Sequence, residues 1–299
     1  MLQRGDKPVI LCAGRIYCDL VFSDIPRMPT LGSETFAGGV SLHAGGGAFN
    51  SAVAFSVLGW SSALLGTLPA APFDVPVLDE GRALGLNMSL CEPASPGSSP
   101  QITVAMALQN DRSFLSHKSG QAFPDLNPAA QTCRSVRHLH IGELKSLCEA
   151  PELVAKAREA GWSISLDCGW DDDLLRAGAE VAEFISAVDV FLPNESEYGA
   201  LRASGLPEDC CPVTVIKEGS TGARTFLDGK TVHRPAFPAD VVDTTGAGDA
   251  FNGGFLSAWL AGEDLEACLE NGNRCGAVAV QHAGGTSGMS QTISSLALN

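Results

Sequence analysis

The sequence has few basic residues and no uninterrupted apolar stretch of the length that spans a membrane. Its 299 residues include 19 Lys and Arg against 34 Asp and Glu, so the formal net charge is −15. A field of this sign repels nucleic acid and anionic lipid, and we expect neither as a partner. No apolar run approaches the roughly 18 residues of a transmembrane helix. The first apolar run is too short for a secretion signal. We therefore expect a soluble, cytoplasmic protein.

Several metal, redox and nucleotide motifs are also missing. No two of the ten cysteines have the C-x-x-C spacing of zinc ribbons and thioredoxin-like sites. The pattern G-x-x-x-x-G-K-[ST] does not occur, which excludes a P-loop kinase. His138 and His140 lie two residues apart on a predicted strand. We expect these two histidines to form a packed pair and not a metal site.

Short apolar runs alternate with helical patterns along most of the chain. The runs predict buried strands at residues 9–13, 61–66, 136–141, 163–167, 188–192 and 213–217. Helical spacing predicts helices at residues 48–58, 151–160, 250–260 and 265–280. Strands that alternate with helices indicate βαβ units, so we predict an α/β fold with a mostly parallel sheet.

Two segments interrupt this alternation, at residues 17–40 and 101–117. The first carries Pro and Gly without a helical period, and the second alternates about Asn110 and Asp111, which predicts a hairpin. We expect the two segments to pair as a small β-sheet lid over the substrate site. The α/β nucleotide-binding and catalytic core then comprises residues 1–16, 41–100 and 118–299.

The most informative segment is residues 243–255, which read DTTGAGDAFNGGF. A turn of small residues opens an apolar helix, and the first amides of a helix have no intrahelical partner and lie at the positive end of its dipole. Such a helix start binds anions. Asp249 in its first turn suits phosphoryl transfer, because a carboxylate there can take the proton of an attacking hydroxyl. The alternative is that Asp249 only complements the helix dipole.

This segment resembles the second signature of the ribokinase-like, or PfkB-type, carbohydrate kinases. HAGGGAFNSAVAFSVLG at residues 43–59 resembles the first signature of that family. PNESE at residues 193–197 resembles its Asn-x-x-Glu motif, and KEGSTGA at residues 217–223 resembles its nucleotide-side strand and turn. The resemblance implies a ribokinase-like three-layer α/β/α core with a small β-sheet lid. It also implies transfer of the γ-phosphoryl group of ATP to a hydroxyl of a small carbohydrate.

The resemblance further implies roles for single residues and a homodimer formed through the lid. The catalytic base would be Asp249, and the anion-hole amides would be those of Gly246, Ala247 and Gly248. The acceptor-binding residues would be Asp19, Gly46, Asn50 and Asp249. The residues that bind ATP would be Asn194, Glu197, Lys217, Gly219, Gly222 and Asn273, with Glu197 also holding Mg²⁺ through water. The monovalent-cation loop, which several family members fill with K⁺, would be Asp243, Thr245, Val280 and Gly284.

Structural roles remain as alternatives for three of these residues. Asp19 also fits an ordinary turn, Asn50 a helix cap, and Glu197 a solvated position at the start of a helix. Glu143 follows a predicted strand and is left without an assigned role.

The sequence departs from the family at Gly47, where many members carry Lys. The charge of that Lys is missing here, and Lys217, Lys118 and Arg15 are the candidates to replace it. The predicted lid also has few basic residues, which favours a neutral sugar or sugar-like alcohol over a sugar phosphate. Gly47 and Phe49 can shape an apolar wall for a base, so a nucleoside kinase is one alternative. A non-catalytic sugar- or nucleotide-binding regulator is another.

Overall fold

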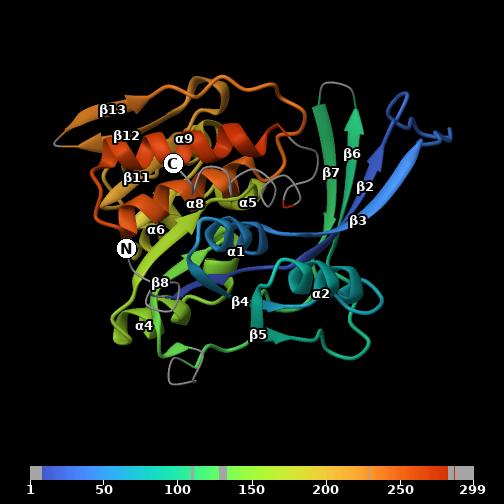
Figure 1. Cartoon of the computed structure of the whole chain (residues 1–299), viewed down its shortest axis with the longest axis horizontal. Coiled ribbons are helices and arrows are strands. Elements are labelled where there is room, and N and C mark those ends of the chain that lie inside the picture. The colour runs from blue at the N-terminus through green and yellow to red at the C-terminus, as the bar shows by residue number, and fades with distance from the viewer. Residues whose placement is uncertain (1–8, 109–110, 128–132, 228, 282–285, 287–299) are drawn as a thin grey trace.

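The largest element of the computed structural model, which describes residues 9–108, 111–127, 133–227, 229–281 and 286, is a nine-stranded sheet (Figure 1). Its strand order is β13-β12-β11-β10-β9-β8-β1-β4-β5. The strands from β11 to β5 run parallel, and β12 and β13 continue the sheet antiparallel. The bounds are β1 (Val9–Ala13), β4 (Ser61–Thr67), β5 (Asn87–Glu92), β8 (Val136–Ile141), β9 (Ser163–Asp167), β10 (Val190–Leu192), β11 (Val213–Lys217), β12 (Ala223–Leu227) and β13 (Lys230–Arg234).

The apolar runs of the sequence lie in the central strands of this sheet. The strands β1, β8, β9 and β11 have the predicted bounds. β4 extends one residue further, to Thr67, and β10 begins two residues later than predicted, at Val190. Every residue of β10 is buried, as are the last four of β1 and of β9. Such strands are covered on both faces, which is why their sequences are continuously apolar.

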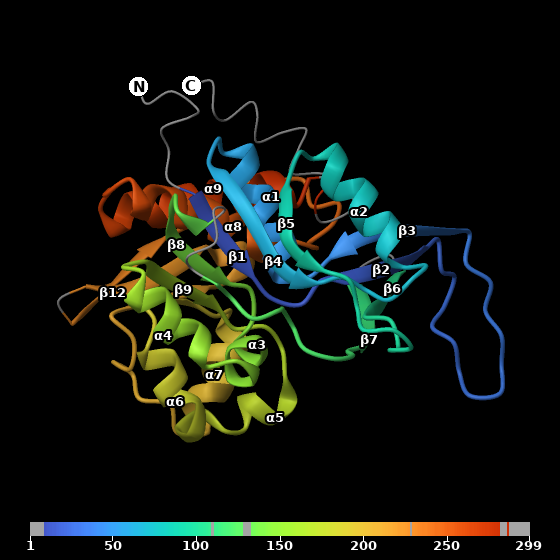
Figure 2. The ribbon, with the colours of Figure 1, turned by 90° about the horizontal axis from the view of Figure 1, so that it is seen from below.

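Helices cover both faces of the sheet and make the predicted three-layer core (Figure 2). One face carries α1 (Gly47–Val57), α8 (Ala247–Leu260) and α9 (Leu265–Ala279). The other face carries α3 (Leu144–Glu149), α4 (Glu152–Glu159), α5 (Asp172–Leu175), α6 (Gly178–Ser186) and α7 (Glu195–Ala203). A separate apolar cluster fills each interface, around Phe49 and Phe255 on the first side and around Trp162 and Phe191 on the second. Within the described part of the chain, no helix combines the length and hydropathy needed to cross a membrane.

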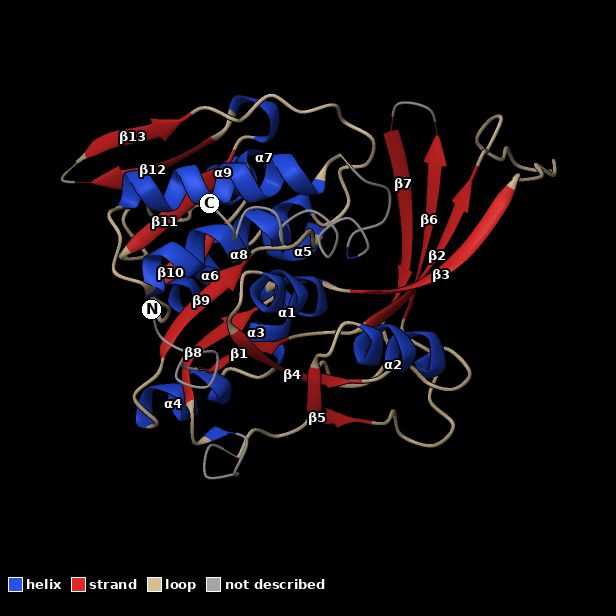
Figure 3. Ribbon diagram, in the orientation of Figure 1, coloured by secondary structure: helices blue, strands red, loops and turns tan. Residues whose placement is uncertain are grey.

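A second, four-stranded sheet stands beside the core, next to α2 (Asp74–Ala83) (Figures 1 and 3). Its strand order is β3 (Gly39–Gly45), β2 (Tyr17–Ser23), β6 (Ile102–Leu108) and β7 (Asp111–His117). β2 and β6 are parallel, which joins the two interrupting segments, and β6 and β7 form the predicted antiparallel hairpin. The predicted turn residue Asn110 lies outside the described residues.

The strands β4 and β8 flank β1 on opposite sides, and we call the region beyond the carboxyl end of β1 the crevice. After β1 the chain passes through the small sheet and α1 to β4 on one side, whereas β8 lies on the other side of β1. Open α/β sheets bind ligands where the connections diverge, beyond the carboxyl ends of the strands. The segments that follow β1, β8, β9, β10 and β11 all meet at this edge.

A buried chain of histidine and serine side chains ties β8 and β9 to α1. His138 is hydrogen-bonded to Ser163 and Ser165, each at 2.8 Å. Ser165 is hydrogen-bonded in turn to His140 (2.8 Å), whose other ring nitrogen contacts Ser51 (3.1 Å). Burial lowers the pKa of His138 to about 3 and that of His140 to about 4, so both rings are neutral. The prediction of a packed pair is confirmed.

Candidate active site

The crevice contains a close pair formed by Asp249 and Asn50. Gly246 adopts the left-handed conformation (φ 72°) and caps α8, and Asp249 lies in the first turn of that helix. Asn50 lies in the first turn of α1, and its Nδ2 donates to Asp249 Oδ2 at 2.9 Å. Asn50 Oδ1 is buried and has no hydrogen-bond partner among the described residues. An unpaired buried carbonyl oxygen is costly, so Oδ1 is available to a donor on a ligand.

Two glycines allow α1 to approach Asp249 so closely. A Cβ atom on Gly47 would lie 2.5 Å from the carbonyl oxygen of Gly142 and 3.5 Å from Asp249 Oδ1. A Cβ atom on Gly142 would lie 2.3 Å from the backbone nitrogen of Ala48. The end of β8 and the start of α1 therefore touch through their backbones. No side chain fits at position 47 without a shift, which is a physical reason for the absence of the family's Lys there.

The three predicted amides at the start of α8 are not equivalent. The Ala247 N–H closes a turn onto the Thr244 carbonyl at 3.3 Å. The N–H groups of Gly246 and Gly248 have no acceptor among the described residues. A Cβ atom on Gly248 would lie 3.5 Å from Lys217 Nζ. The ammonium group of Lys217 therefore lies beside the free amides, where an anion would be held.

A buried polar triad holds Lys217 in this position. Its Nζ donates to Asp167 Oδ1 at 2.9 Å, to Asp167 Oδ2 at 3.1 Å and to Asn252 Oδ1 at 3.2 Å. Asn252 Nδ2 donates to Asp167 Oδ2 at 2.5 Å. The carboxylates of Asp167 and Glu197 raise the pKa of Lys217 against the effect of burial, so it stays charged. Asp167 and Asn252 are not among the predicted site residues; the signal that could identify Asp167 is its position at the carboxyl end of a parallel strand.

Electrostatics favour a proton acceptor at Asp249. Burial and, next, the charge of Asp167 raise its pKa to about 7, while the hydrogen bond from Asn50 and the charge of Lys217 act in the opposite direction. A base is most effective when its pKa is near the working pH. Asp249 therefore has the protonation behaviour of a general base at neutral pH.

Asn194 and Glu197 form a capping box at the start of α7. Asn194 Oδ1 accepts from the Glu197 N–H (2.9 Å), and Glu197 Oε2 accepts from the Asn194 N–H (2.8 Å). The Lys217 N–H donates to the Pro193 carbonyl at 2.9 Å, which joins this turn to the end of β11. Glu197 lies in the first turn of a helix, but it is not the solvated residue of the structural alternative, because only 6% of its surface is exposed. Burial and the nearby Asp167 raise its pKa.

Asp19 lies in β2 of the small sheet and not in a turn after β1. A Cβ atom on Gly45 would lie 2.1 Å from Asp19 Oδ2, so the carboxyl group covers the glycine that precedes Gly46. Gly46 itself requires glycine because its φ is 101°. Burial raises the pKa of Asp19 to about 7, against a hydrogen bond from Thr103 that lowers it. The small sheet thus contributes a carboxyl group beside the glycine turn that leads to Asn50.

Three of the predicted nucleotide residues, Gly219, Gly222 and Asn273, lie around the antiparallel end of the large sheet. Gly219 begins a 3-10 turn, and Gly222 has a φ of 115°. A Cβ atom on Gly222 would lie 2.0 Å from the Arg234 carbonyl oxygen. Asn273 Nδ2 donates to the same carbonyl (2.8 Å) and to that of Pro235 (3.2 Å). Gly222 and Asn273 therefore shape the segment that follows β13.

The predicted cation loop is compact where the structure describes it. Asp243 Oδ1 accepts from the Thr245 N–H at 2.6 Å. The Val280 carbonyl accepts from the N–H groups of Val242 (2.8 Å) and Asp243 (3.0 Å). These contacts bring Asp243, Thr245 and Val280 together and occupy the Val280 carbonyl. Gly284 lies outside the described residues.

Comparison with known proteins gives consistent matches over nearly the whole chain. The family described as "pfkB family carbohydrate kinase" matches residues 32–292. An ATP-dependent ribose-1-phosphate kinase of Halopiger xanaduensis is 27% identical over 288 residues, which are 93% of this chain and 94% of the relative. A ribokinase of Bacillus subtilis is 27% identical over 289 residues, 94% of this chain and 95% of the relative.

Solved structures share the fold. A nucleoside kinase of Methanocaldococcus jannaschii has a TM-score of 0.80 at 21% identity and covers 97% of this chain and 98% of its own. A ribokinase of Arabidopsis thaliana, complexed with ribose and ATP, has a TM-score of 0.80 at 22% identity and covers 98% of both chains.

Proposed function

The chain belongs to the pfkB family of carbohydrate kinases, and we propose that it transfers the γ-phosphoryl group of ATP to a hydroxyl of a small carbohydrate held beside Asp249. The observation that carries this assignment is the Asp249–Asn50 pair next to the unpaired amides of Gly246 and Gly248. A carboxyl group, an open amide acceptor and an anion-binding helix start then lie within one crevice. Phosphoryl transfer needs these three elements together.

Asp249 acts as the general base of this reaction. Its carboxylate takes the proton of the acceptor hydroxyl as the oxygen bonds to the γ-phosphorus, and the bond from the γ-phosphorus to the bridging oxygen breaks. The products are a phosphate ester, ADP and a protonated Asp249. The hydrogen bond from Asn50 fixes the orientation of the base. Asn50 Oδ1, unpaired among the described residues, accepts a hydrogen bond from an acceptor hydroxyl.

Lys217 and the α8 amides stabilise the phosphoryl group during transfer. Gly248 in the first turn of α8 lies beside the ammonium group of Lys217, which Asp167 and Asn252 hold in place through hydrogen bonds. Preorganised donors of this kind stabilise developing charge without a reorganisation cost. Lys217 thus takes the place of the Lys that many family members carry at the position of Gly47.

Glu197 is suited to hold, through water, the Mg²⁺ that accompanies ATP, whereas both carboxylate oxygens of Asp167 already accept hydrogen bonds from Lys217 and Asn252. Mg²⁺ binds through one or two carboxylates, waters and substrate phosphates, and a full protein cage is not needed. Glu197 is a buried acid whose pKa is raised by burial and by Asp167, so a divalent cation would offset a real electrostatic cost. Bound Mg²⁺ supplies neutralisation of phosphate charge. The segments proposed to surround the nucleotide are ordered by Asn194, Gly219, Gly222 and Asn273. Binding of K⁺ at the loop of Asp243 stays a prediction.

The small sheet is proposed as the lid over the acceptor. Asp19 on β2 and the Gly46 turn face the same crevice as Asn50, which supports binding of acceptor hydroxyls by all three. We assign the lid to the four-stranded sheet, which comprises segments 17–40 and 101–117 together with the remainder of β3, up to Gly45. The lid also provides the surface for the expected homodimer.

A nucleoside acceptor is the second candidate. It is supported by the nucleoside kinases among the related proteins and structures. A turnover assay with both kinds of acceptor separates a sugar kinase from a nucleoside kinase, because a nucleoside kinase turns over nucleosides and not free sugars.

The deciding experiment is ATP-to-ADP turnover with Mg²⁺ across sugars, sugar phosphates, sugar acids and nucleosides. Wild-type protein is compared with Asp249→Asn and with Asp209→Asn, an exposed Asp outside the site. We expect Asp249→Asn to lose about 10²- to 10⁴-fold in kcat while calorimetry shows retained ATP binding. Asp209→Asn should match wild type. Unchanged turnover in Asp249→Asn would contradict the assignment, and saturable binding without turnover in wild type would identify a regulator.

A further inference from the structure

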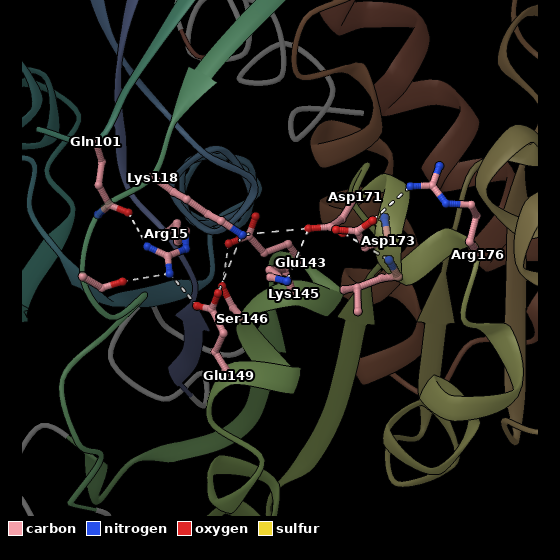
Figure 4. A network of polar contacts seen from close by, with 12 residues as sticks. Arg15, Gln101, Lys118, Glu143, Lys145, Ser146, Glu149, Asp171, Asp173 and Arg176 are labelled. Atoms are coloured by element: carbon pink, nitrogen blue, oxygen red, sulfur yellow. Dashed lines mark hydrogen bonds and ion pairs between the residues drawn. The ribbon is translucent and has the colours of Figure 1, made fainter.

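Two lysines, Lys118 and Lys145, converge on the carboxylate of Asp171, close to Glu143 and Glu149 (Figure 4). Lys118 follows β7 at the base of the lid, and Lys145 lies in α3 of the core. Their ammonium nitrogens lie 3.9 and 3.6 Å from Asp171 Oδ2, and Lys118 Nζ is also 3.9 Å from Glu149 Oε1. The pair therefore bridges lid and core, although the two lysines are 27 positions apart in the sequence.

The N–H donors of both lysines are available. Distances of 3.6 to 3.9 Å give electrostatic attraction but no hydrogen bond. No described residue accepts a hydrogen bond from either ammonium group. The neighbouring Arg15 differs, because its terminal nitrogens donate to Gln101 Oε1 (2.6 Å), the Gly120 carbonyl (2.9 Å) and Glu149 Oε2 (2.5 Å). Arg15 is therefore a structural cation, whereas the two lysines are not committed.

Asp171 does not need the lysines for its own stabilisation. Its Oδ1 caps α5 by accepting from the N–H groups of Asp173 and Leu174, both at 3.1 Å. The same bonds and the two lysines lower its pKa against partial burial. The Asp171 carboxylate therefore has hydrogen-bond partners at the helix start and also attracts both ammonium groups.

Glu143 connects the lysine pair to the reaction centre. It directly follows Gly142, whose carbonyl oxygen lies against Gly47 beside Asp249. Its carboxyl group accepts from Ser146 Oγ (2.5 Å) and from the backbone N–H of Arg15. Gly169, two residues before Asp171, packs on the Glu143 side chain, since a Cβ atom there would lie 3.2 Å from Glu143 Cβ. Asp171 and its two lysines are therefore connected, through Gly169 and Glu143, to the backbone contact beside Asp249.

We propose that Lys118 and Lys145 bind an anionic group, a carboxylate or a phosphate monoester, carried by the acceptor at the end remote from its reacting hydroxyl. This inference rests on the proposed kinase function. In a chain of net charge −15, an anionic acceptor needs local cations on the protein side, and two uncommitted ammonium groups supply them. The expectation of a neutral acceptor came from the number of basic residues in the lid. It does not take into account that Lys145, from the core, lies beside Lys118.

The first test compares matched acceptors on the wild-type protein. Neutral sugars are paired with their phosphate monoesters and with their sugar acids, and kcat/KM is measured with saturating MgATP. We expect one anionic class to exceed its neutral partner by about tenfold or more, since charge-assisted hydrogen bonds are the stronger kind. The better anionic class then identifies the acceptor group. Equal or better turnover of the neutral partners overturns the proposal and leaves the kinase assignment intact.

Variants identify the lysines as the cause. Lys118→Gln and Lys145→Gln should each raise KM for the anionic acceptor by about tenfold, with kcat much less affected, and should leave any neutral acceptor unchanged. Lys118→Arg should restore most of the effect. Lys156→Gln is the matched control, because Lys156 lies on α4, outside the site, and pairs there with Asp125. Equal effects on neutral and anionic acceptors, or a KM no different from wild type, would overturn the assignment.

A binding measurement keeps the two hypotheses separable. Calorimetric titration of the protein with inorganic phosphate should show weak binding that is reduced in Lys118→Gln/Lys145→Gln and retained in Lys156→Gln. If no acceptor of any class is turned over and Asp249→Asn equals wild type, the kinase assignment fails. Lysine-dependent phosphate binding would then support the anion site on its own, and lysine-independent binding would refute it.

Discussion

Asp249 and Asp19 both carry a pKa raised to about 7, and burial is the main cause at each. They differ in their neighbours, which are Asp167 for Asp249 and Glu80 for Asp19. A base must be ionised to accept a proton, so activity is lost as the pH falls through the pKa. We expect the acid limb of kcat/KM to have a midpoint near pH 7, in contrast to the usual carboxyl range near 4.

The pH profiles of wild type and Asp19→Asn check this expectation. If ionisation of Asp249 sets the acid limb of the pH profile, the midpoint of that limb stays near pH 7 in Asp19→Asn, although kcat/KM of this variant is lower than that of wild type. A midpoint below 5 in both proteins would contradict the role of Asp249.

The stability of the fold depends on pH in the opposite direction from activity. A carboxyl group whose pKa is raised in the folded state loses its contribution to stability as the pH rises from about 4 to 7. Asp249→Asn should therefore raise the urea midpoint at pH 8 and have little effect at pH 4.

Lys217 and Asp167 provide a second test at the scale of residues. Their side chains are 13% and 11% exposed, so removal of one partner leaves a largely buried charge. We expect Lys217→Met to lower the free energy of unfolding by about 3 kcal/mol. The double variant Lys217→Met/Asp167→Asn should recover much of this loss, because the unpaired buried charge is then removed. Urea denaturation measures both. Arg82→Met, which breaks the exposed Arg82–Asp79 pair, should cost less than about 1 kcal/mol. Similar losses for Lys217→Met and Arg82→Met would contradict the buried-charge argument.

At the scale of elements, the contact between β8 and α1 positions the catalytic pair. Gly47→Ala places a Cβ atom 2.5 Å from the Gly142 carbonyl, so α1 must shift and carry Asn50 with it. We expect kcat/KM to fall by about 10²-fold, the usual effect of a displacement of about 1 Å at a reaction centre. Gly199→Ala is the control, since nothing lies within 4 Å of that position in α7. Wild-type activity in Gly47→Ala would show that the approach is not required.

The predictability of the elements follows their burial. Strands such as β1 and β9 are buried on both faces, so their apolar runs are visible without tertiary context. α2 has no such signal, because it contains Pro76 and buries only Val77 and Gly81. β12 and β13 form an antiparallel edge: β12 buries only Ala223 and Thr225, and every residue of β13 is exposed or half-buried. Elements with little buried surface are specified by their neighbours, which a local sequence pattern does not reveal.

The predictability of the site follows a similar rule. The turn before Asp249 can be recognised from the sequence, because a run of small residues at the start of a helix is typical of an anion-binding site. Asp167 is different, since its importance depends on Lys217 from β11 and Asn252 from α8 being brought beside β9. Asp19 is a similar case, because it lies on β2 and comes beside the Gly46 turn only through the pairing of β2 with β3. Local motifs predict local geometry, and contacts between distant elements need the fold.

At the scale of the whole molecule, the lid carries exposed apolar side chains on both of its edge strands. Val40 and Leu42 on β3 are 64% and 46% exposed, and Phe114 and Leu115 on β7 are 57% and 69% exposed. Apolar edge strands of this kind are usually covered in natural proteins. We expect wild-type protein to sediment at twice 31.0 kDa.

Leu42→Glu together with Phe114→Glu should shift the protein to 31.0 kDa while its circular dichroism stays unchanged. Leu227→Glu, at an exposed site on β12, is the control and should remain a dimer. A single 31.0 kDa species for the wild type would contradict the dimer.

The strand order also separates the two substrates along the edge of the large sheet. Segments that follow β1 and β8, with the lid, provide the proposed acceptor contacts, and segments that follow β10 and β11 provide the nucleotide side. β9 lies between them and contributes Asp167. A change of acceptor can therefore be made by exchange of short surface segments while the phosphate chemistry stays in place. In evolutionary terms the two halves are modules, and one core can be inherited unchanged by enzymes that serve many different acceptors.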